Sequence, residues 1–462
     1  MRAASARSRV DPPRGPVTRS ATQNALLDRL QHDTFRFFWE QANTDNGLIP
    51  DKTAEGSPSS IAAVGLGLAC YTVGAEHGFV SRAEAALRAR TVLRTFWEGE
   101  QSEDPGAMGH RGFFYHFLDM ETGRRAMECE LSTIDSTFLF AGALAAGLYF
   151  DREDPVEHEV RELGDQIYRR ADWQWALNGG VAVTHGWKPE TGFLEARWSG
   201  YNEAILLYAL ALGSPTFPTP PEGYAAWTRT YRWKKLYDIE FLYAGPLFIH
   251  QLSHVWIDFR GIQDDFMRER GIDYFENSRR ATYIQQQYAK RNPRKMEGYG
   301  EFVWGITASD GPGPAERVIN GVERKFWDYW ARGVPWGPDD GTLSPWAVVA
   351  SLPFAPEIVL PTIETIDAVY PEAIQEYGFR CSLNPTYRAL GGGDGWISKG
   401  YYGIDQGPIV LMIENDRNEF LWRLMKGSPY IVKGLRRAGF DGGWLNAPSP
   451  EDVGWKSLTI SS

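Results

Sequence analysis

The sequence contains little cysteine and no long uninterrupted apolar run. Its three cysteines, Cys70, Cys129 and Cys381, are odd in number and far apart, so they form neither a metal-ligand cluster nor a disulfide framework, and at most one pair can join. No apolar run approaches the roughly 20 residues that a membrane-spanning helix needs. The sequence therefore predicts a fold stabilised by its own apolar core.

An excess of positive charge and the usual cofactor motifs are also missing. Lys and Arg number 48 against 59 Asp and Glu, a net charge of −11, which argues against a nucleic acid or an anionic membrane as partner. The sequence has no H-E-x-x-H motif, no phosphate-binding G-x-x-x-x-G-K-[ST] motif and no G-x-S-x-G motif with a histidine triad. His250 and His254 are interpreted as core histidines, and we predict no metal and no cofactor.

Helix-length segments of two kinds alternate along the chain. Segments that are apolar on all sides, as buried helices are, begin near residues 60, 132, 200, 241, 343 and 408, and amphipathic ones begin near 24, 81, 155, 225, 273 and 361. Strand-like alternation is confined to loops, which disfavours a parallel α/β fold. We predict one all-α domain over residues 21–462, an (α/α)6 barrel of six inner and six outer helices, preceded by a disordered leader over residues 1–20.

Three carboxylates precede or open apolar helices: Asp135, Glu203 and Asp405. If the inner helices are parallel, these acids share one rim and face one pocket. Glycosidic cleavage in its commonest form needs two such carboxyl groups, one to protonate the leaving oxygen and one to activate water or attack carbon. Burial would raise the pKa of Glu203, whereas backbone N–H groups at a helix start would keep Asp405 ionised. The alternative for Glu203 alone is a helix cap.

Aromatic residues are abundant, with 18 Trp, and many of them lie beside Gly, Asp or Asn in loops. Most must belong to the core, but sugar rings offer C–H faces that stack on indoles in polar loops. Asp51, Asp310, Asp339 and Asp340 are further loop acids, and acids beside glycine are usually turn formers. The candidate substrate-binding residues are Trp187, Trp198, Tyr201, Asn202, Glu130, Trp304, Asp310, Trp396 and Tyr402.

Several long motifs resemble one family. These are residues 198–204 (WSGYNEA), 130–135 (ELSTID), 302–312 (FVWGITASDGP) and 351–357 (SLPFAPE). They resemble the glucoamylase-like domain of the group that includes glycoside hydrolase family 144, the β-1,2-glucanases, and the resemblance covers roughly residues 22–430. It implies an (α/α)6 barrel and anomer-inverting hydrolysis without a metal. It also implies that Glu203 is the general acid, Asp405 the base and Asp135 an acid that binds sugar or holds water.

The sequence thus predicts a monomeric glycoside hydrolase acting on β-1,2-glucan or its oligosaccharides. The alternatives are a glycosidase or transglycosidase of other linkage, an epimerase or lyase on the same barrel, and a non-catalytic carbohydrate-binding protein. Residues 1–20 lack the apolar core of a signal peptide, whereas family members are typically exported. The compartment therefore stays open, as does endo or exo action, which depends on whether the loops over residues 291–342 close one end of the cleft.

Overall fold

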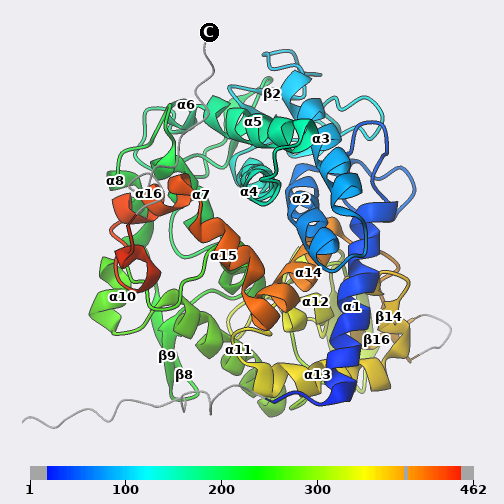
Figure 1. Ribbon diagram of the computed structural model, residues 1–462. Helices are drawn as coiled ribbons and strands as arrows, with labels where there is room; N and C mark the ends of the chain where they lie inside the picture. The colour runs from blue at the N-terminus through cyan, green and yellow to red at the C-terminus, as the bar shows by residue number, and fades with distance from the viewer. Residues whose placement is uncertain (1–17, 390–393, 449–462) are drawn as a thin grey trace, which may run out of the picture.

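The computed structural model describes residues 18–389 and 394–448, and its helices form two concentric rings (Figure 1). The inner ring is made of mostly buried helices: α2 (Ile61–Glu76), α4 (Thr133–Tyr149), α7 (Ile205–Gly213), α9 (Leu252–Trp256), α12 (Pro345–Val349) and α14 (Gly403–Asn418). The outer ring comprises α1 (Ala21–Glu40), α3 (Arg82–Glu98), α5 (Pro155–Arg170), α11 (Tyr274–Arg291), α13 (Pro356–Val369) and α16 (Pro429–Arg437). The prediction of an all-α barrel is confirmed; most of the expected leader lies outside the described residues.

The first half of the ring is built from long helices that the sequence caps locally. Ser20 and Ser81 form capping boxes at the starts of α1 and α3, and Ser60 and Ser132 accept N–H bonds at the starts of α2 and α4. Such caps satisfy backbone donors that have no partner inside the helix. Inner helices α2 and α4 then approach so closely that a Cβ at Gly65 would collide with the backbone of α4. The small residues in these apolar segments allow the two helix backbones to approach each other closely.

The second half of the ring departs from the sequence prediction. The outer helix expected over residues 225–237 is a short helix, α8 (Glu222–Thr228), followed by a hairpin of β8 (Trp233–Leu236) and β9 (Ile239–Leu242). Tyr237 and Asp238, the two turn residues, both have positive φ, as a two-residue hairpin loop requires. The apolar helix expected over residues 241–257 is reduced to a 3₁₀ turn, η1 (Leu247–His250), and α9.

A segment from the end of the chain completes this half. Helix α16 lies beyond the last helix predicted from the sequence, the one beginning near residue 408, and packs against the inner helix α7. The remaining helical pieces are α6 (Trp173–Ala176), α10 (Asp265–Arg270), α15 (Phe420–Lys426), η2 (Pro371–Ala373) and η3 (Gly443–Asn446). No helix in the described part of the chain has the length and apolar character needed to cross a membrane.

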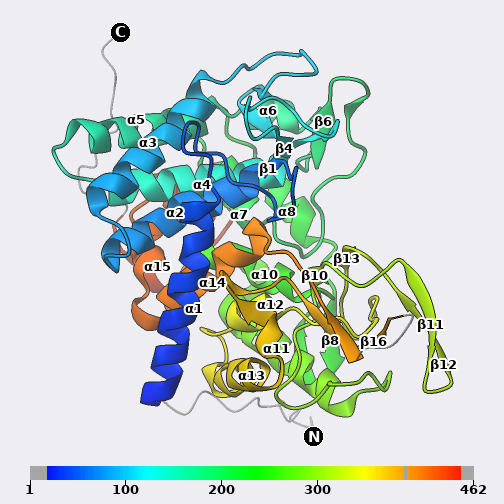
Figure 2. The same cartoon turned by 90° about the vertical axis from the view of Figure 1, so that its right-hand side faces the viewer.

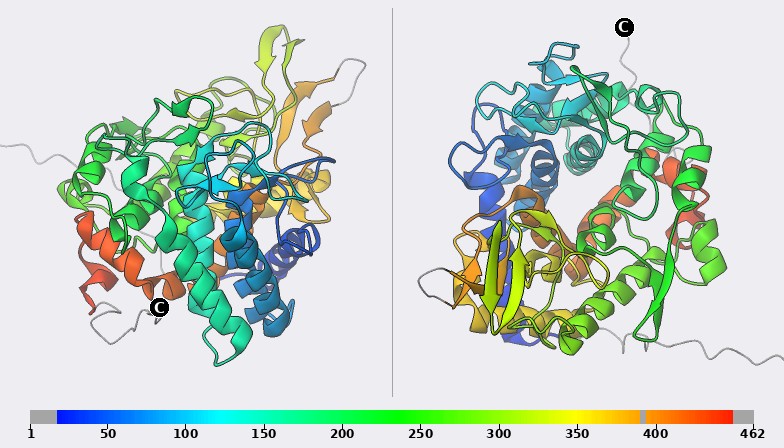
Figure 3. Two further views of the ribbon diagram at one scale, coloured as in Figure 1. Left: turned by 90° about the horizontal axis from the view of Figure 1, so that it is seen from above. Right: turned by 180° about the vertical axis from the view of Figure 1, so that it is seen from behind.

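Small antiparallel sheets gather on one side of the barrel (Figures 2 and 3), the side on which the inner helices begin. One sheet has the order β2 (Gly109–His110), β3 (Phe113–Tyr115), β5 (Leu131–Ser132), β6 (Gly186–Lys188) and β7 (Gly192–Phe193). The other pairs are β1 (Ser59–Ser60) with β4 (Phe117–Leu118), β10 (Ala308–Ser309) with β13 (Trp330–Ala331), β11 (Ala315–Ile319) with β12 (Val322–Phe326), β14 (Ile374–Gln375) with β15 (Gly378–Phe379), and β16 (Leu383–Arg388) with β17 (Asp394–Ile397). The rim is therefore made of loops and hairpins resting on a helical ring.

Candidate active site

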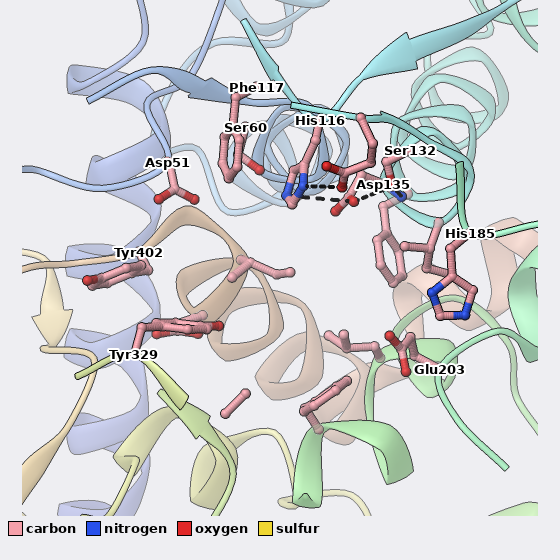
Figure 4. Close-up of a pocket in the computed structure, with 18 of the residues that line it drawn as sticks. Asp51, Ser60, His116, Phe117, Ser132, Asp135, His185, Glu203, Tyr329 and Tyr402 are labelled. Atoms are coloured by element: carbon pink, nitrogen blue, oxygen red, sulfur yellow. Dashed lines mark hydrogen bonds and ion pairs between the residues drawn. The ribbon is translucent and has the colours of Figure 1, made fainter. Parts of the chain in front are cut away.

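A cavity of about 550 Å³ lies where the inner helices begin, and the three predicted catalytic acids line it. Asp135 lies in the first turn of α4, Asp405 in the first turn of α14, and Glu203 two residues before α7. Figure 4 shows Glu203 on one side of the cavity, with Asp135 and His116 above it and Asp51 across from it. The structure therefore brings together acids that are 270 residues apart in sequence, from Asp135 to Asp405.

Asp135 belongs to a hydrogen-bonded cluster. Ser132 Oγ donates to Asp135 Oδ2 at 2.5 Å and accepts the Asp135 N–H at 3.2 Å. The His116 ring lies between two carboxylates, with Nδ1 3.0 Å from Glu130 Oε1 and Nε2 3.7 Å from Asp135 Oδ2. Burial by itself lowers the pKa of His116, but Asp135, Glu130 and Asp51 together raise it to about 9. An imidazolium therefore offsets the negative charge on this side of the pocket.

The same three side chains are the ones whose geometry could hold a metal ion. Ligand atoms of His116, Glu130 and Asp135 lie within 4.8 Å of one another, and imidazole with carboxylates is a common donor set for divalent metals. Here these atoms also make the ion pairs described above, and a protonated imidazole offers no lone pair to a metal. The absence of a metal from the chemistry stays a prediction.

Glu203 is half-buried in the pocket wall. Its backbone carbonyl accepts a hydrogen bond from Ser253 Oγ at 2.7 Å, and the preceding Asn202 accepts from the Ala204 N–H and from Trp227 Nε1, both at 3.1 Å. Burial, with a further contribution from the charge of Asp135, raises the pKa of Glu203 to about 7. A carboxyl group with such a pKa is protonated in a large fraction of molecules near neutrality, as a general acid must be.

Asp405 is buried, and its surroundings differ from the expectation. Its carboxyl interacts with the thiol of Cys381, whose Sγ accepts the Asp310 N–H at 3.4 Å, while Asp405 Oδ2 has no hydrogen-bond partner among the described residues. Burial raises the pKa of Asp405 well above its usual range, and the charges of Asp51 and Asp310 raise it further. The expectation that backbone N–H groups at the helix start favour the charged form is wrong in its net effect, because desolvation outweighs them, so only the ionised fraction of Asp405 can act as a base.

Aromatic rings form two opposite parts of the pocket wall. Trp198 stacks on His185 with ring centroids 3.9 Å apart and donates its Nε1–H to Thr133 Oγ1 at 2.9 Å. Tyr402 lies beside Tyr329 with ring centroids 6.0 Å apart, and in Figure 4 this pair is across the cavity from Glu203. Of the predicted substrate-binding residues, Trp198, Glu130 and Tyr402 line the pocket.

Three other candidates are used by the core around the pocket. Trp304 is fully buried, so it cannot stack on a sugar. Tyr201 is buried against His250 and Tyr274, and Asn202 holds the turn before α7 as described above. They support the site from behind and do not line it.

The last three candidates lie outside the cavity for other reasons. Trp187 stacks on His110, with ring centroids 5.0 Å apart, in the β-sheet of the rim. Asp310 lies behind Asp405 and accepts a hydrogen bond from Ser398 at 2.9 Å. Trp396 lines a separate surface cleft beside β16. Aromatic residues near glycine were thus a poor guide to the pocket.

The two histidines assigned to the core are buried. His254 Nε2 lies 2.9 Å from Ser278 Oγ, and burial lowers the pKa of His250 to about 4 and that of His254 to about 3. The core interpretation is confirmed. The pocket instead contains polar and aromatic residues that sequence reasoning left out, namely Lys52, His116, His185, Tyr329 and Trp346, together with Asp51, which it interpreted as a turn-forming loop acid.

A helical barrel with carboxylic acids where its inner helices begin is the architecture of a carbohydrate-active (α/α)6-barrel protein. Comparisons with known proteins identify the family. The family model described as "Glycoamylase: Putative glucoamylase" matches residues 195–429. A "putative glucoamylase" from Bacteroides uniformis is 30% identical, with a TM-score of 0.82 over 93% of this chain and 100% of that one. The chain belongs to this glucoamylase-like family.

Two relatives from Parabacteroides distasonis carry more specific names. An exo β-1,2-glucooligosaccharide sophorohydrolase (non-reducing end) is 27% identical over 91% of this chain, which spans 58% of that protein's length. A solved β-1,2-glucanase structure is 25% identical, with a TM-score of 0.80 over 92% of this chain and 61% of that one. This chain thus spans about three fifths of the length of these two relatives.

Proposed function

We propose that the protein is a glycoside hydrolase that cleaves β-1,2-linked glucan or its oligosaccharides with inversion of the anomeric carbon. The observation that carries the proposal is Glu203, a carboxyl group with a pKa of about 7 in a pocket that also contains the buried acid Asp405. The names of the Parabacteroides distasonis relatives support the linkage. These names belong to proteins longer than this chain, which spans 58% and 61% of their lengths.

In the proposed reaction Glu203 gives its proton to the glycosidic oxygen as the bond from that oxygen to the anomeric carbon breaks. Asp405 in its ionised form takes a proton from a water molecule, and the water oxygen bonds to the anomeric carbon from the opposite face of the ring. Glu203 ends ionised and Asp405 ends protonated, and transfer of one proton through solvent restores the starting state. A water molecule fits between the carboxyl groups if they are about 6.5–9.5 Å apart.

The surroundings of the two acids suit these tasks. A general acid works best when its pKa lies near the working pH, and a base of raised pKa has a stronger drive to accept a proton. Asp135, hydrogen-bonded to Ser132 and paired with His116, would hold sugar hydroxyls or the attacking water. Trp198 and Tyr402, which line the pocket, would offer aromatic surface to sugar units.

The proposal is tested by incubating the protein with a panel of β-1,2-, β-1,3-, β-1,4-, β-1,6- and α-linked glucans, separating the products and following the first anomer formed by NMR. We expect cleavage of the β-1,2 linkage, with the α-anomer appearing first. A β-anomer appearing first would overturn inversion, and cleavage of another linkage would overturn the substrate. An isomer or an unsaturated sugar would favour an epimerase or a lyase, and binding without any product would favour a carbohydrate-binding protein.

A further inference from the structure

Tyr329 is a pocket residue that lies in an irregular stretch of the rim, between β12 and β13. Tyr329 precedes β13, and its side chain lines the cavity beside Tyr402, although 48% of its surface is exposed. Loss of hydration at the hydroxyl, followed by the charges of Asp405 and neighbouring acids, raises the pKa of Tyr329. Its hydroxyl therefore stays protonated and is a hydrogen-bond donor on the Asp405 side of the pocket.

The stretch that carries Tyr329 is held by a fully buried arginine. Arg332 pairs with Asp340, Nε to Oδ1 at 2.8 Å, and both side chains have no exposed surface. The guanidinium also donates to the backbone carbonyls of Ser309 at 2.6 Å and of Trp327 and Asp328 at 3.0 Å each. The Arg332 guanidinium thereby ties the residues on both sides of Tyr329 to β10.

Both carboxylate oxygens of Asp340 also accept backbone hydrogen bonds. Its Oδ2 accepts the Trp327 N–H at 3.1 Å, and its Oδ1 accepts the Thr342 N–H at 3.1 Å. A buried ion pair adds little net stability, because desolvation offsets the attraction, but such groups can specify one conformation. The acid that sequence reasoning took for a turn former thus fixes the course of the rim over the pocket.

Close backbone packing restricts the conformation of the segment that carries Tyr329. A Cβ at Gly311 would collide with the Arg332 guanidinium and the Trp327 carbonyl, and one at Gly313 would collide with the Phe326 backbone. Gly311 belongs to one of the motifs on which the family resemblance rests. The segment over residues 327–332 therefore packs closely against the backbone of Gly311 and Gly313.

We propose that Tyr329 contacts the substrate, stacking on a sugar ring and donating to a sugar hydroxyl, and that the buried Arg332–Asp340 pair positions it. This inference rests on the proposed function, whose substrate it places against the wall formed by Tyr329 and Tyr402. The wall lies across the cavity from Glu203 (Figure 4). Tyr329 would then help to decide which sugar units are held on that side of the cleaved bond.

The first test removes the side chain on an otherwise intact rim. Stacking contacts and hydrogen bonds are modest individually, so we expect Tyr329→Ala to lower kcat/KM on β-1,2-linked oligosaccharides by roughly 10-fold or more, mainly through KM, and Tyr329→Phe by roughly 3-fold. Trp336→Ala is the matched control: this rim residue is 58% exposed, packs on Tyr243 and does not line the pocket. We expect it to leave kcat/KM unchanged.

The second test asks whether the ion pair acts through Tyr329, using a double-mutant cycle. Asp340→Asn should lower kcat/KM roughly 10-fold when Tyr329 is present and by less than about 2-fold in the Tyr329→Ala background. Gly311→Ala, which displaces Arg332 without removing a charge, should follow the same pattern. Arg82→Gln, which breaks the distant Arg82–Glu157 pair of α3 and α5, should lower the melting temperature alone.

The outcomes separate the two proposals. A wild-type protein that cleaves no β-1,2-linked substrate overturns the proposed function and this inference with it. A wild-type protein that does so, with Tyr329→Ala fully active, overturns the substrate contact alone. Equal losses from Asp340→Asn in both backgrounds, with Gly311→Ala behaving likewise, overturn the positioning role.

Discussion

Asp135 and Asp405 hold the same position in two inner helices and have different surroundings. Each is the third residue of its helix, follows an isoleucine and lines the same pocket. Ser132 caps α4 and hydrogen-bonds Asp135, whereas Tyr402, at the corresponding position before α14, makes no side-chain cap. Asp135 has an imidazolium, His116, as its neighbour; Asp405 Oδ2 has no hydrogen-bond partner in the described part of the chain.

The difference shows that a carboxylate's role depends on its neighbours more than on its place in a helix. A hydroxyl donor and a nearby cation favour the charged form of a carboxylate, and burial without them disfavours it. Asp405 is therefore suited to accept a proton during the reaction, and Asp135, held by Ser132 and His116, to bind substrate or water. The predictions below test this division of roles.

The largest effect is expected for Asp405→Asn. The amide keeps the shape of the side chain but cannot take a proton, so turnover should fall about 10²–10⁴-fold. Affinity for a β-1,2-linked oligosaccharide, measured by calorimetry, should stay within a few-fold of wild type. Turnover within 10-fold of wild type, in a variant that melts normally, would assign the base to another acid, with Asp51 the first candidate.

Asp135→Asn should have a smaller and different effect. Losing a charged hydrogen-bond acceptor costs about 1.5–3 kcal/mol, so the dissociation constant should rise roughly 10–100-fold, with a fall in rate as well. Calorimetry on both variants gives the comparison directly. Unchanged affinity in Asp135→Asn would remove the distinction between the two aspartates.

The pH dependence of kcat/KM should reflect both raised pKa values. Activity should fall above about pH 7 as Glu203, with its pKa of about 7, loses its proton, and the acidic limb should lie above the ordinary aspartate pKa of 3.8. An alkaline limb two units higher would mean that another group is the acid.

The raised pKa of Glu203 also makes the free energy of unfolding depend on pH. The folded-state pKa of Glu203 lies above its ordinary 4.5, so the unfolded chain releases this proton first and stability is lost as the pH rises from 4.5 to 7. Glu203→Gln should therefore melt higher than wild type at pH 8, and the two should melt alike at pH 4.

The smallest effect is expected for Ser132→Ala. Loss of the cap should cost about 0.5–2 kcal/mol of stability, and loss of the hydrogen bond to Asp135 should raise KM several-fold. Ser81→Ala, which removes the cap of the outer helix α3, should lower the melting temperature without changing KM. Equal KM values for the two variants would argue against a role for Ser132 in the site.

The first half of the fold could be predicted because its information is local. The expected starts near residues 60, 81, 132 and 155 lie within one residue of the observed ones. Each of these helices has a Ser or Asp cap, as in Ser60, Ser81, Ser132 and Asp154. In the second half the inner helices α7, α9 and α12 are short and have no side-chain cap, and α16 reaches α7 from more than 200 residues away. Nothing local in the sequence encodes that contact.

The residues of the site likewise fall into those that local sequence predicts and those that it does not. Glu203, Asp135 and Asp405 could be found because each lies where an apolar helix begins. Tyr329 could not, because it lies in an irregular stretch of the rim and meets its pocket neighbour Tyr402, 73 residues later in the sequence, only in the folded chain. Trp304 was selected because it precedes a glycine in a loop, but packing against the core buries it.

The most direct test of the account asks whether Glu203 protonates the leaving group. Wild type and Glu203→Gln are compared on a β-1,2-linked oligosaccharide and on the corresponding glycosyl fluoride, whose leaving group needs little protonation. The account predicts that Glu203→Gln loses about 10²–10⁴-fold on the oligosaccharide and less than about 10-fold on the fluoride. Equal losses on both substrates would show that Glu203 is not the general acid.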